Sequence, residues 1–271
     1  MMQSIGSTPI PERFSGVIGL GAPTAIFPVK KSVSWGSGIL GALLLAGAAL
    51  TVLYGIYNVI VQTDKHGPAV FQDAITTPAY LAGTMLLSGV ILAAVAIMNL
   101  NRVAVVYEKG LAYNDRHGLQ TWRWEEVDLF FIQITRHYSY GIKTGTTHHY
   151  TLKKADGSHI WLDDSFGKIQ DLGTAVQQKV FPLQYERLVQ ALKNGQTVTL
   201  GPVALSSQGI TIGKKSFPWP EVEQVGVQRG FITIKKKEGG WFSGATASVA
   251  TVPNLEAMLA VVDQIVRVKA G

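Results

Sequence analysis

The sequence predicts an α+β protein: two N-terminal transmembrane helices, then a strand-rich part made of two similar units in tandem. Two observations favour this class. Residues 32–63 and 74–101 contain no Asp, Glu, Lys or Arg, although such residues are common in the rest of the chain. From residue 102 onward, short segments alternate apolar and polar side chains between turn residues, which is typical of antiparallel strands. The apolar residues are therefore expected to divide between a membrane part and a folded β-rich part.

Two apolar runs are long enough to cross a membrane. They cover residues 36–61 and 78–100, and a helix needs about 20 residues to cross the hydrocarbon core. With their short connection they predict a helical hairpin over residues 35–101. A buried core helix is the alternative interpretation. A cleaved signal peptide fits poorly, because its apolar core has only about 7–15 residues.

Basic residues outside the runs predict an orientation. Several flank the pair of runs on the outside and one lies between them: Arg13, Lys30, Lys31, Arg102, Lys109 and Arg116 outside, and Lys65 between. Short segments rich in Lys and Arg stay on the cytoplasmic side. We therefore expect a multi-pass protein of the cell membrane with both termini in the cytoplasm. Residues 1–34, with several prolines and glycines, are expected to form a loosely ordered cytoplasmic tail.

Small residues inside the runs predict how the helices pack. Gly47, Thr51 and Gly55 recur at four-residue spacing, and Gly89 with Ala93 offers a matching face. Small side chains let helix backbones approach closely in membranes. Neither run contains an ionisable residue, so the usual marker of an ion path is missing.

The motif GSGILG at residues 36–41 matches a dinucleotide-binding pattern. That pattern binds a cofactor only where it follows a strand and opens a helix. Here it opens a membrane span, so we expect no cofactor.

One motif occurs twice in the strand-rich part. WRWEEV at 122–127 and FPWPEV at 217–222 each follow a glycine, an apolar residue and a polar turn. We interpret Trp124 and Trp219 as core anchors, with a ligand platform as the alternative, because a buried aromatic stabilises a small β domain strongly.

The repeated motif divides this part of the chain in two. The first unit covers residues 102–195 and includes a helical linker, and the second covers residues 196–271. Apolar spacing predicts a helix from about Lys168 that Pro182 ends or kinks. A second helical stretch is expected after Pro182 and stops at Gly195. A further helix is expected to start near Asn254 and to close the second unit.

The chain resembles bacterial membrane-anchored proteins with pleckstrin-homology-like (PH-like) domains. The resemblance depends on the two spans, on the repeated Trp-acid-Val motif and on the order of several strands before an amphipathic helix. The resemblance covers nearly the whole chain from Trp35 onward. It implies two tandem PH-like units, each an antiparallel β sandwich or barrel with a C-terminal helix. It implies no catalytic residues, because that family has no established set and no characterised function.

A basic run beside two aromatic residues is the candidate binding site. Lys235, Lys236 and Lys237 precede Trp241 and Phe242 in a glycine-rich loop. Near a membrane, aromatic rings can lie at headgroup level while lysines meet lipid phosphates. We interpret this segment as a site for anionic lipid or a partner protein, with an ordinary solvated face as the alternative.

Two further features stay open. The segment 138–147, rich in Tyr, Gly and Thr, is expected to be a hairpin tip, with a recognition loop as the alternative. His148 and His149 are adjacent and therefore point to opposite faces of a strand. A metal site that includes His159 across a hairpin is the lesser alternative, and we expect no bound metal.

Composition and motifs exclude several classes of function. The chain has no cysteine, which excludes thiolate nucleophiles and iron–sulfur clusters, and its net charge of +6 falls short of a nucleic-acid-binding surface. No known catalytic spacing is visible. We expect a non-enzymatic scaffold or sensor, anchored in the bilayer, that binds a protein or anionic lipid. The alternative is an accessory subunit of a larger membrane enzyme or transporter, and an independent enzyme comes third.

Overall fold

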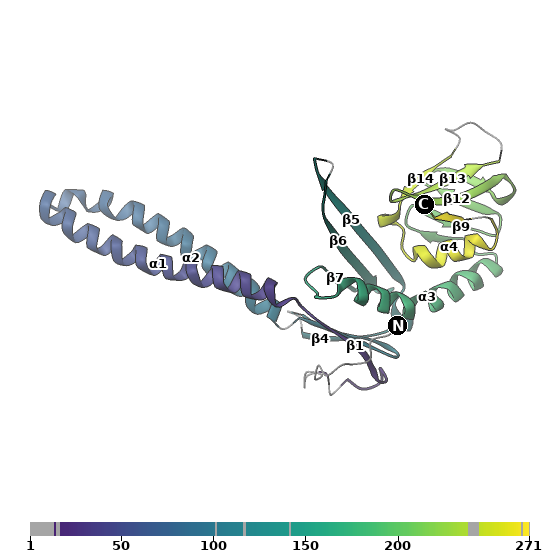
Figure 1. Ribbon diagram of the computed structural model, residues 1–271, viewed down its shortest axis with the longest axis horizontal. Coiled ribbons are helices and arrows are strands. Elements are labelled where there is room, and N and C mark those ends of the chain that lie inside the picture. Colours follow the sequence, from purple (N-terminus) through teal and green to yellow (C-terminus); the bar gives the residue numbers. More distant parts are fainter. Residues whose placement is uncertain are drawn as a thin grey trace. The chain divides into compact units, whose positions relative to one another are not determined.

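The computed structural model describes residues 14, 17–100, 102–115, 118–140, 142–237, 244–266 and 268–270. It confirms a mixed α+β class, because these residues contain four α-helices, two of them long and apolar, and several antiparallel sheets (Figure 1). The chain divides into two compact units. The helical unit comprises Pro28–Ala104 with Tyr113–Leu119, and the strand-rich unit comprises the remainder.

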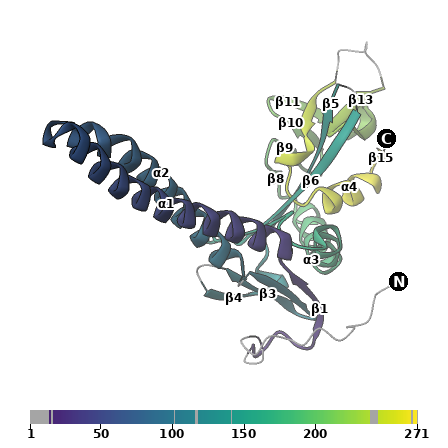
Figure 2. The same ribbon diagram turned by 60° about the vertical axis from the view of Figure 1, so that its left-hand side comes forward.

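The helical unit is dominated by α1 (Lys31–His66) and α2 (Phe71–Leu100), joined by the short helix η2 (Pro68–Val70). Both long helices are apolar and long enough to cross a membrane, and they run side by side in both views (Figures 1 and 2). Large apolar side chains such as Leu53 and Leu87 point outward. Helix α2 begins at Phe71 and contains Pro78, whereas the sequence predicted a span that starts at Pro78.

The first sheet has the strand order β1-β2-β3-β4, with β1 (Pro23–Pro28), β2 (Val103–Tyr107), β3 (Gly110–Asp115) and β4 (Gly118–Arg123). Strand β1 precedes α1 in the chain, in the segment that composition predicted to be a loose tail. The Thr24 hydroxyl donates to the Val106 carbonyl at 3.0 Å, and the Glu108 N–H donates to the Ala22 carbonyl at 3.0 Å. Leu20 and Phe27 are buried. The described end of this segment is therefore an integral edge of the sheet.

The second sheet has the order β5-β6-β7, with β5 (Leu129–Ser139), β6 (Ile142–Lys153) and β7 (His159–Asp163). The turn between β6 and β7 contains Asp156 and Gly157. Gly157 has φ of 88° and donates its N–H to the Lys154 carbonyl at 3.1 Å, a conformation that glycine adopts without strain. We call β2 to β7, together with the helix that follows them, the first repeat.

Helix α3 (Ile169–Lys193) follows β7 and is continuous through Pro182. Of the two expectations for Pro182, that it ends the helix is therefore wrong, and the stretch expected to follow it belongs to the same helix. The N-terminal half of α3 buries Leu172, Val176 and Val180, and Leu188 in the C-terminal half belongs to the core of the second repeat. Packing along both halves stabilises the helix and outweighs the hydrogen bond that proline removes.

The second repeat is built in the same order. One sheet has the order β11-β10-β9-β8 and the other β14-β13-β12-β15. The strands are β8 (Val198–Leu200), β9 (Val203–Leu205), β10 (Gly209–Ile212), β11 (Lys215–Pro218), β12 (Val222–Gln228), β13 (Phe231–Lys236), β14 (Thr246–Ser248) and β15 (Val268–Ala270). Their pairings are antiparallel except for the parallel pair of β12 and β15. Helix α4 (Leu255–Asp263) lies between β14 and β15 in the chain.

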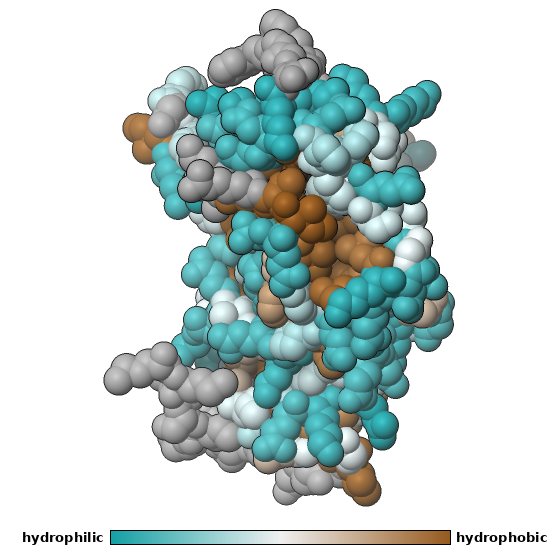
Figure 3. All heavy atoms as spheres, turned by 90° about the vertical axis from the view of Figure 1, so that its right-hand side faces the viewer, coloured by the Kyte–Doolittle hydropathy of each residue, from teal (hydrophilic) through white to brown (hydrophobic). Residues whose placement is uncertain are grey.

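The core of the second repeat draws on both helices. Ile210, Ile232 and Met258 are fully buried in it, and Tyr185, Val189 and Leu192 of α3 pack against its margin. The second repeat is thus completed by a helix that the first repeat supplies. On the outside of the molecule, Figure 3 shows apolar surface gathered in a hollow between two hydrophilic regions of one face.

Candidate functional site

The two motif tryptophans make the same contacts in the two repeats. Trp124 donates its backbone N–H to the Lys109 carbonyl (3.1 Å) and its indole Nε1–H to the Tyr107 carbonyl (3.2 Å). Trp219 donates to the Gln208 carbonyl (3.1 Å) and the Ser206 carbonyl (3.1 Å) in the same way. Both rings are buried. Their geometry is that of core anchors whose polar atom is satisfied.

A glycine faces each tryptophan hairpin. A Cβ atom at Gly110 would lie 2.2 Å from the Trp122 carbonyl oxygen, and one at Gly209 would lie 2.3 Å from the Phe217 carbonyl oxygen. No real side chain tolerates such a distance to backbone. The glycines that precede the motif in the sequence are therefore required for close approach of two strands.

The motif glutamates also have equivalent partners. Glu126 binds the Lys154 ammonium at 2.8 Å, and Glu221 binds the Lys236 ammonium at 2.8 Å. Each lysine lies over an aromatic ring two residues before the motif tryptophan, Lys154 over Trp122 (4.6 Å) and Lys236 over Phe217 (6.0 Å). Such contacts satisfy both charges locally.

Glu126 shows the electrostatic effect of this arrangement. The hydrogen bond from Lys154, followed by the backbone N–H of Arg123, holds the pKa of the Glu126 carboxyl below its usual value. A general acid needs a raised pKa and a free path to substrate. Glu126 has the opposite shift, so its position suits a structural ion pair.

The candidate lysine run is partly engaged. Lys235 binds Glu223 at 2.7 Å, Lys236 binds Glu221, and the backbone N–H of Lys237 donates to the Glu221 carbonyl at 2.9 Å. Trp241 and Phe242, the aromatic half of this candidate, lie outside the described residues. Two of the three lysines therefore face glutamates and have less charge to offer a lipid phosphate.

The histidines on β6 diverge as expected. His148 is buried, its Nδ1 lies 3.2 Å from Asp164 Oδ1, and its Nε2 lies 2.8 Å from Gln170 Nε2. Both ring nitrogens of His148 are therefore engaged by neighbouring side chains. His149 faces the opposite side and pairs in register with Asp163. Among the described residues no cluster of three potential metal ligands occurs.

The helix interface repeats every seven residues. Gly41, Ala48 and Gly55 are buried on α1, and Ala82, Gly89 and Ala96 are buried on α2. A Cβ at Gly89 would lie 3.1 Å from the Gly41 carbonyl oxygen, and one at Gly55 would lie 2.9 Å from Pro78 Cβ. A seven-residue period is the signature of two helices in a left-handed supercoil.

Of the five residues predicted for packing, Gly55 and Gly89 lie at the buried centre of this interface. Gly47, Thr51 and Ala93 are half-buried at its flank. The Thr51 hydroxyl donates to the Gly47 carbonyl at 2.8 Å. Gly41 was missed by sequence reasoning, although its spacing of fourteen from Gly55 would have revealed a heptad pattern.

Beside Pro78 the two helices line an open cavity of about 220 Å³. Polar side chains contribute much of its lining: Thr51, Tyr54, Asn58, Asp73 and Thr77. Polar groups at such a position in a bilayer recruit water or the polar side chains of another helix.

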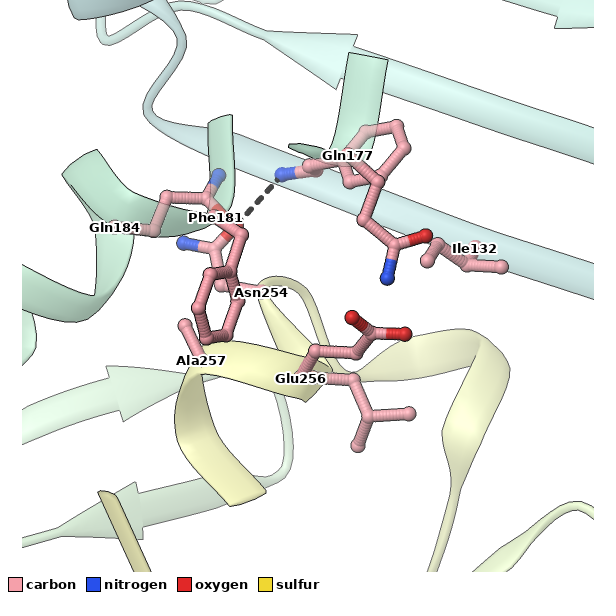
Figure 4. A pocket seen from close by; sticks show the side chains of 9 residues that line it. Ile132, Gln177, Phe181, Gln184, Asn254, Glu256 and Ala257 are labelled. Atoms are coloured by element: carbon pink, nitrogen blue, oxygen red, sulfur yellow. Dashed lines mark hydrogen bonds between the residues drawn. The ribbon is translucent and has the colours of Figure 1, made fainter. Parts of the chain in front are cut away.

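A second, very small pocket lies where the two repeats meet (Figure 4). Asn254 closes it by accepting the Phe130 N–H at its side-chain oxygen (2.8 Å) and donating to the Asp128 carbonyl (2.9 Å). Gln184 is buried beside it, and its Nε2 has no hydrogen-bond partner among the described residues. The pocket has room for about one water molecule, which suits that amide and is too small for a substrate.

Three large, strongly exposed side chains of the strand-rich unit lie on the hairpin of β5 and β6. Tyr138 is 61 % exposed, Ile142 is 71 % exposed and Tyr140 is fully exposed. Strand β7 pairs only with His149–Lys153 of β6, so the distal part of the hairpin is a ribbon of two strands. The segment that the sequence marked as a hairpin tip is therefore a projecting arm (Figure 1).

Comparison with known proteins gives a family and no activity. The model of a family described as "Family of unknown function (DUF6585)" matches residues 16–270. No curated protein matches the chain.

Proposed function

Because this chain belongs to DUF6585, a family of unknown function whose model covers residues 16–270, we propose its function from its geometry. We propose a membrane-anchored, non-enzymatic scaffold or sensor. The helical hairpin lies in a bilayer, and two PH-like repeats bind a partner protein or anionic lipid at its cytoplasmic face. The observation that carries this proposal is the outward apolar surface of α1 and α2.

Three features of the helices support residence in lipid. Both are long enough to cross. Their large apolar side chains face outward while small residues fill the interface, which is the reverse of a helix buried in a soluble core. The carbonyl of Ala74, which lacks an intrahelical partner because of Pro78, accepts a hydrogen bond from Asn58. In hydrocarbon every backbone group needs such a partner.

The element order supports the PH-like interpretation. In each repeat, strands of a four-stranded sheet come first in the chain, strands of a second sheet follow, and a helix comes after them. The tryptophan, glycine and glutamate–lysine contacts recur in both. Fold alone assigns no activity. The candidate acid–base groups support a binding role, because Glu126, Glu221 and His148 are engaged in structural contacts.

An accessory subunit is the second candidate, and the cavity beside Pro78 favours it. The cavity is lined by polar side chains, including Asp73 and Asn58. Polar side chains on membrane helices hydrogen-bond to neighbouring helices in larger assemblies. A stoichiometric membrane partner that contacts this cavity would make the chain a subunit of that complex.

The test of the anchor uses the full-length chain in membranes. We expect it to resist extraction by alkaline carbonate. Because the chain lacks cysteine, single cysteines at Gly67 and Gly195 can be labelled with a membrane-impermeant maleimide. Gly67→Cys should react only from outside and Gly195→Cys only from the cytoplasmic side. Release by carbonate, or equal labelling of both sites from one side, would contradict the anchored hairpin.

The test of the binding role is purification in mild detergent with quantitative mass spectrometry of co-eluting proteins and lipids. A stoichiometric protein or enrichment of anionic lipid is the expected result. A chain that purifies with neither, although it remains folded, contradicts the binding function.

A further inference from the structure

The distal hairpin of β5 and β6 is an isolated two-stranded ribbon. We call Ile134–Ser139, Tyr140 and Ile142–His148 the β5–β6 arm. Register pairs Ile134 with His148 and Ser139 with Ile142, and a bulge lies between His137 and Tyr138. A hairpin without a third strand or a packed face is at best marginally stable in water. A further contact is needed to hold this arm.

The tip of the arm has the chemistry of a membrane interface. Tyr138, Tyr140 and Ile142 are its most exposed large side chains. Tyrosine places an apolar ring and a polar hydroxyl at the boundary between headgroups and acyl chains. Two tyrosines and one isoleucine within five positions leave an apolar surface that water solvates poorly.

The charged residues of the arm are all basic. From residue 129 to residue 155 the chain contains no Asp or Glu. Arg136 and Lys143 flank the tip, and both are exposed and without an ion-pair partner among the described residues. Lys235 and Lys236, by contrast, are held by Glu223 and Glu221. Free cations beside exposed aromatics complement an anionic surface, where each contributes roughly 1 kcal/mol.

We propose that the tip of the β5–β6 arm inserts into the headgroup layer of an anionic lipid surface. Tyr138, Tyr140 and Ile142 enter the interface, and Arg136 and Lys143 bind lipid phosphates. This inference rests on the proposed function, and it places the lipid contact on the arm in preference to the Lys235–Lys237 run.

The experiment uses the full chain in lipid nanodiscs with one fluorophore. Ser139→Cys attaches an environment-sensitive dye between Tyr138 and Tyr140 without removing either ring. Ala155→Cys, in the exposed turn at the opposite end of β6, is the matched control. Nanodiscs contain phosphatidylcholine alone or equal parts of phosphatidylcholine and phosphatidylglycerol. Emission wavelength, quenching by spin-labelled lipid and quenching by aqueous iodide are measured.

The arm should insert only in anionic discs. There the dye at 139 should shift to the blue and be quenched by spin-labelled lipid, while the dye at 155 stays open to iodide. Replacement of both Arg136 and Lys143 by Gln should lower the inserted-to-free ratio by about tenfold or more. Replacement of both Tyr138 and Ile142 by Ser should also abolish lipid quenching, and the matched Lys235→Gln/Lys236→Gln variant should leave it within about twofold.

Two outcomes would overturn the proposal. One is equal iodide access at 139 and 155 in anionic discs. The other is protection of position 139 from iodide without lipid quenching, because that shows contact with protein along the free edge of β5. Failure of the anchor itself is read separately, since a chain that does not enter nanodiscs at all contradicts the proposed function before the arm is tested.

Discussion

The side-chain amide of Asn58 donates a 3.0 Å hydrogen bond to the backbone carbonyl of Ala74 on the facing helix. Ala74 lies four residues before Pro78, which has no N–H to give this carbonyl. Asn58 thus supplies the donor that proline removes. Gly55 leaves the space for the ring of Pro78, since a Cβ there would lie 2.9 Å from Pro78 Cβ.

This relationship predicts a double-mutant cycle. Asn58→Ala should lower the stability of the helical hairpin by about 0.5–1.5 kcal/mol, because it leaves the Ala74 carbonyl unpaired. In a Pro78→Ala background the restored N–H pairs that carbonyl, and Asn58→Ala should cost less than half as much. Thermal unfolding in detergent measures all four proteins. An equal cost in both backgrounds would refute the pairing.

The glycine at the helix interface predicts a second pair of variants. A Cβ at Gly89 would lie 2.9 Å from Leu45 Cγ, while one at Gly83 meets nothing within 4 Å. Gly89→Leu should separate the helices and destabilise them by about 1–3 kcal/mol. Gly83→Leu, on the same helix, should be close to neutral. Unfolding in detergent compares them, and similar losses would argue against the seven-residue interface.

Asn254 predicts how the repeats are coupled. It adopts a left-handed conformation with φ of 53° and exchanges hydrogen bonds with Phe130 and Asp128. Asn254→Gly keeps the conformation and loses the side-chain bonds, so it should cost about 1–3 kcal/mol. Asn254→Ala should cost roughly 1 kcal/mol more because of backbone strain. Chemical denaturation ranks the variants, and hydrogen exchange should show faster opening at Phe130. A milder effect of Ala than of Gly would contradict the role of the left-handed conformation.

The Glu126 ion pair predicts a pH dependence. Its pKa is lowered in the folded chain, so the folded state holds fewer protons than the unfolded state at acid pH. The resulting stability is present above the unfolded pKa near 4.5 and is lost as pH falls through the lower folded value. The carboxylate is 45 % exposed and screened, so the contribution stays below about 1 kcal/mol. Glu126→Gln should flatten this part of the stability–pH curve, and Glu125→Gln should not.

Some features could be predicted from the sequence because they depend on local pattern. The long apolar helices follow from uninterrupted hydrophobic runs. The equivalent buried positions of Trp124 and Trp219 follow from a repeated motif. The turn at Gly157 follows from the conformational freedom of glycine. Each of these depends on residues close together in the chain.

Other features depend on partners far apart in sequence. Lys236 at the end of β13 meets Glu221 just before β12, so the lysine run gave no sign that two of its three charges are paired. Strand β1 pairs with β2, and the whole helical hairpin separates the two strands in the sequence. Composition alone therefore suggested a loose tail for the segment that contains β1. Pro182 reads locally as a helix end, but packing on two cores keeps α3 continuous.

Helix α3 packs against the cores of both repeats, and this has a consequence during translation. Its C-terminal half, with Tyr185 and Leu188, leaves the ribosome before the strands that cover it exist. At about 5–20 residues per second, that apolar face waits several seconds for the chain to reach α4. The apolar face of the C-terminal half of α3 therefore stays exposed to solvent until the second repeat is made. Chaperone contact or aggregation during translation should concentrate on the residues of this one helix.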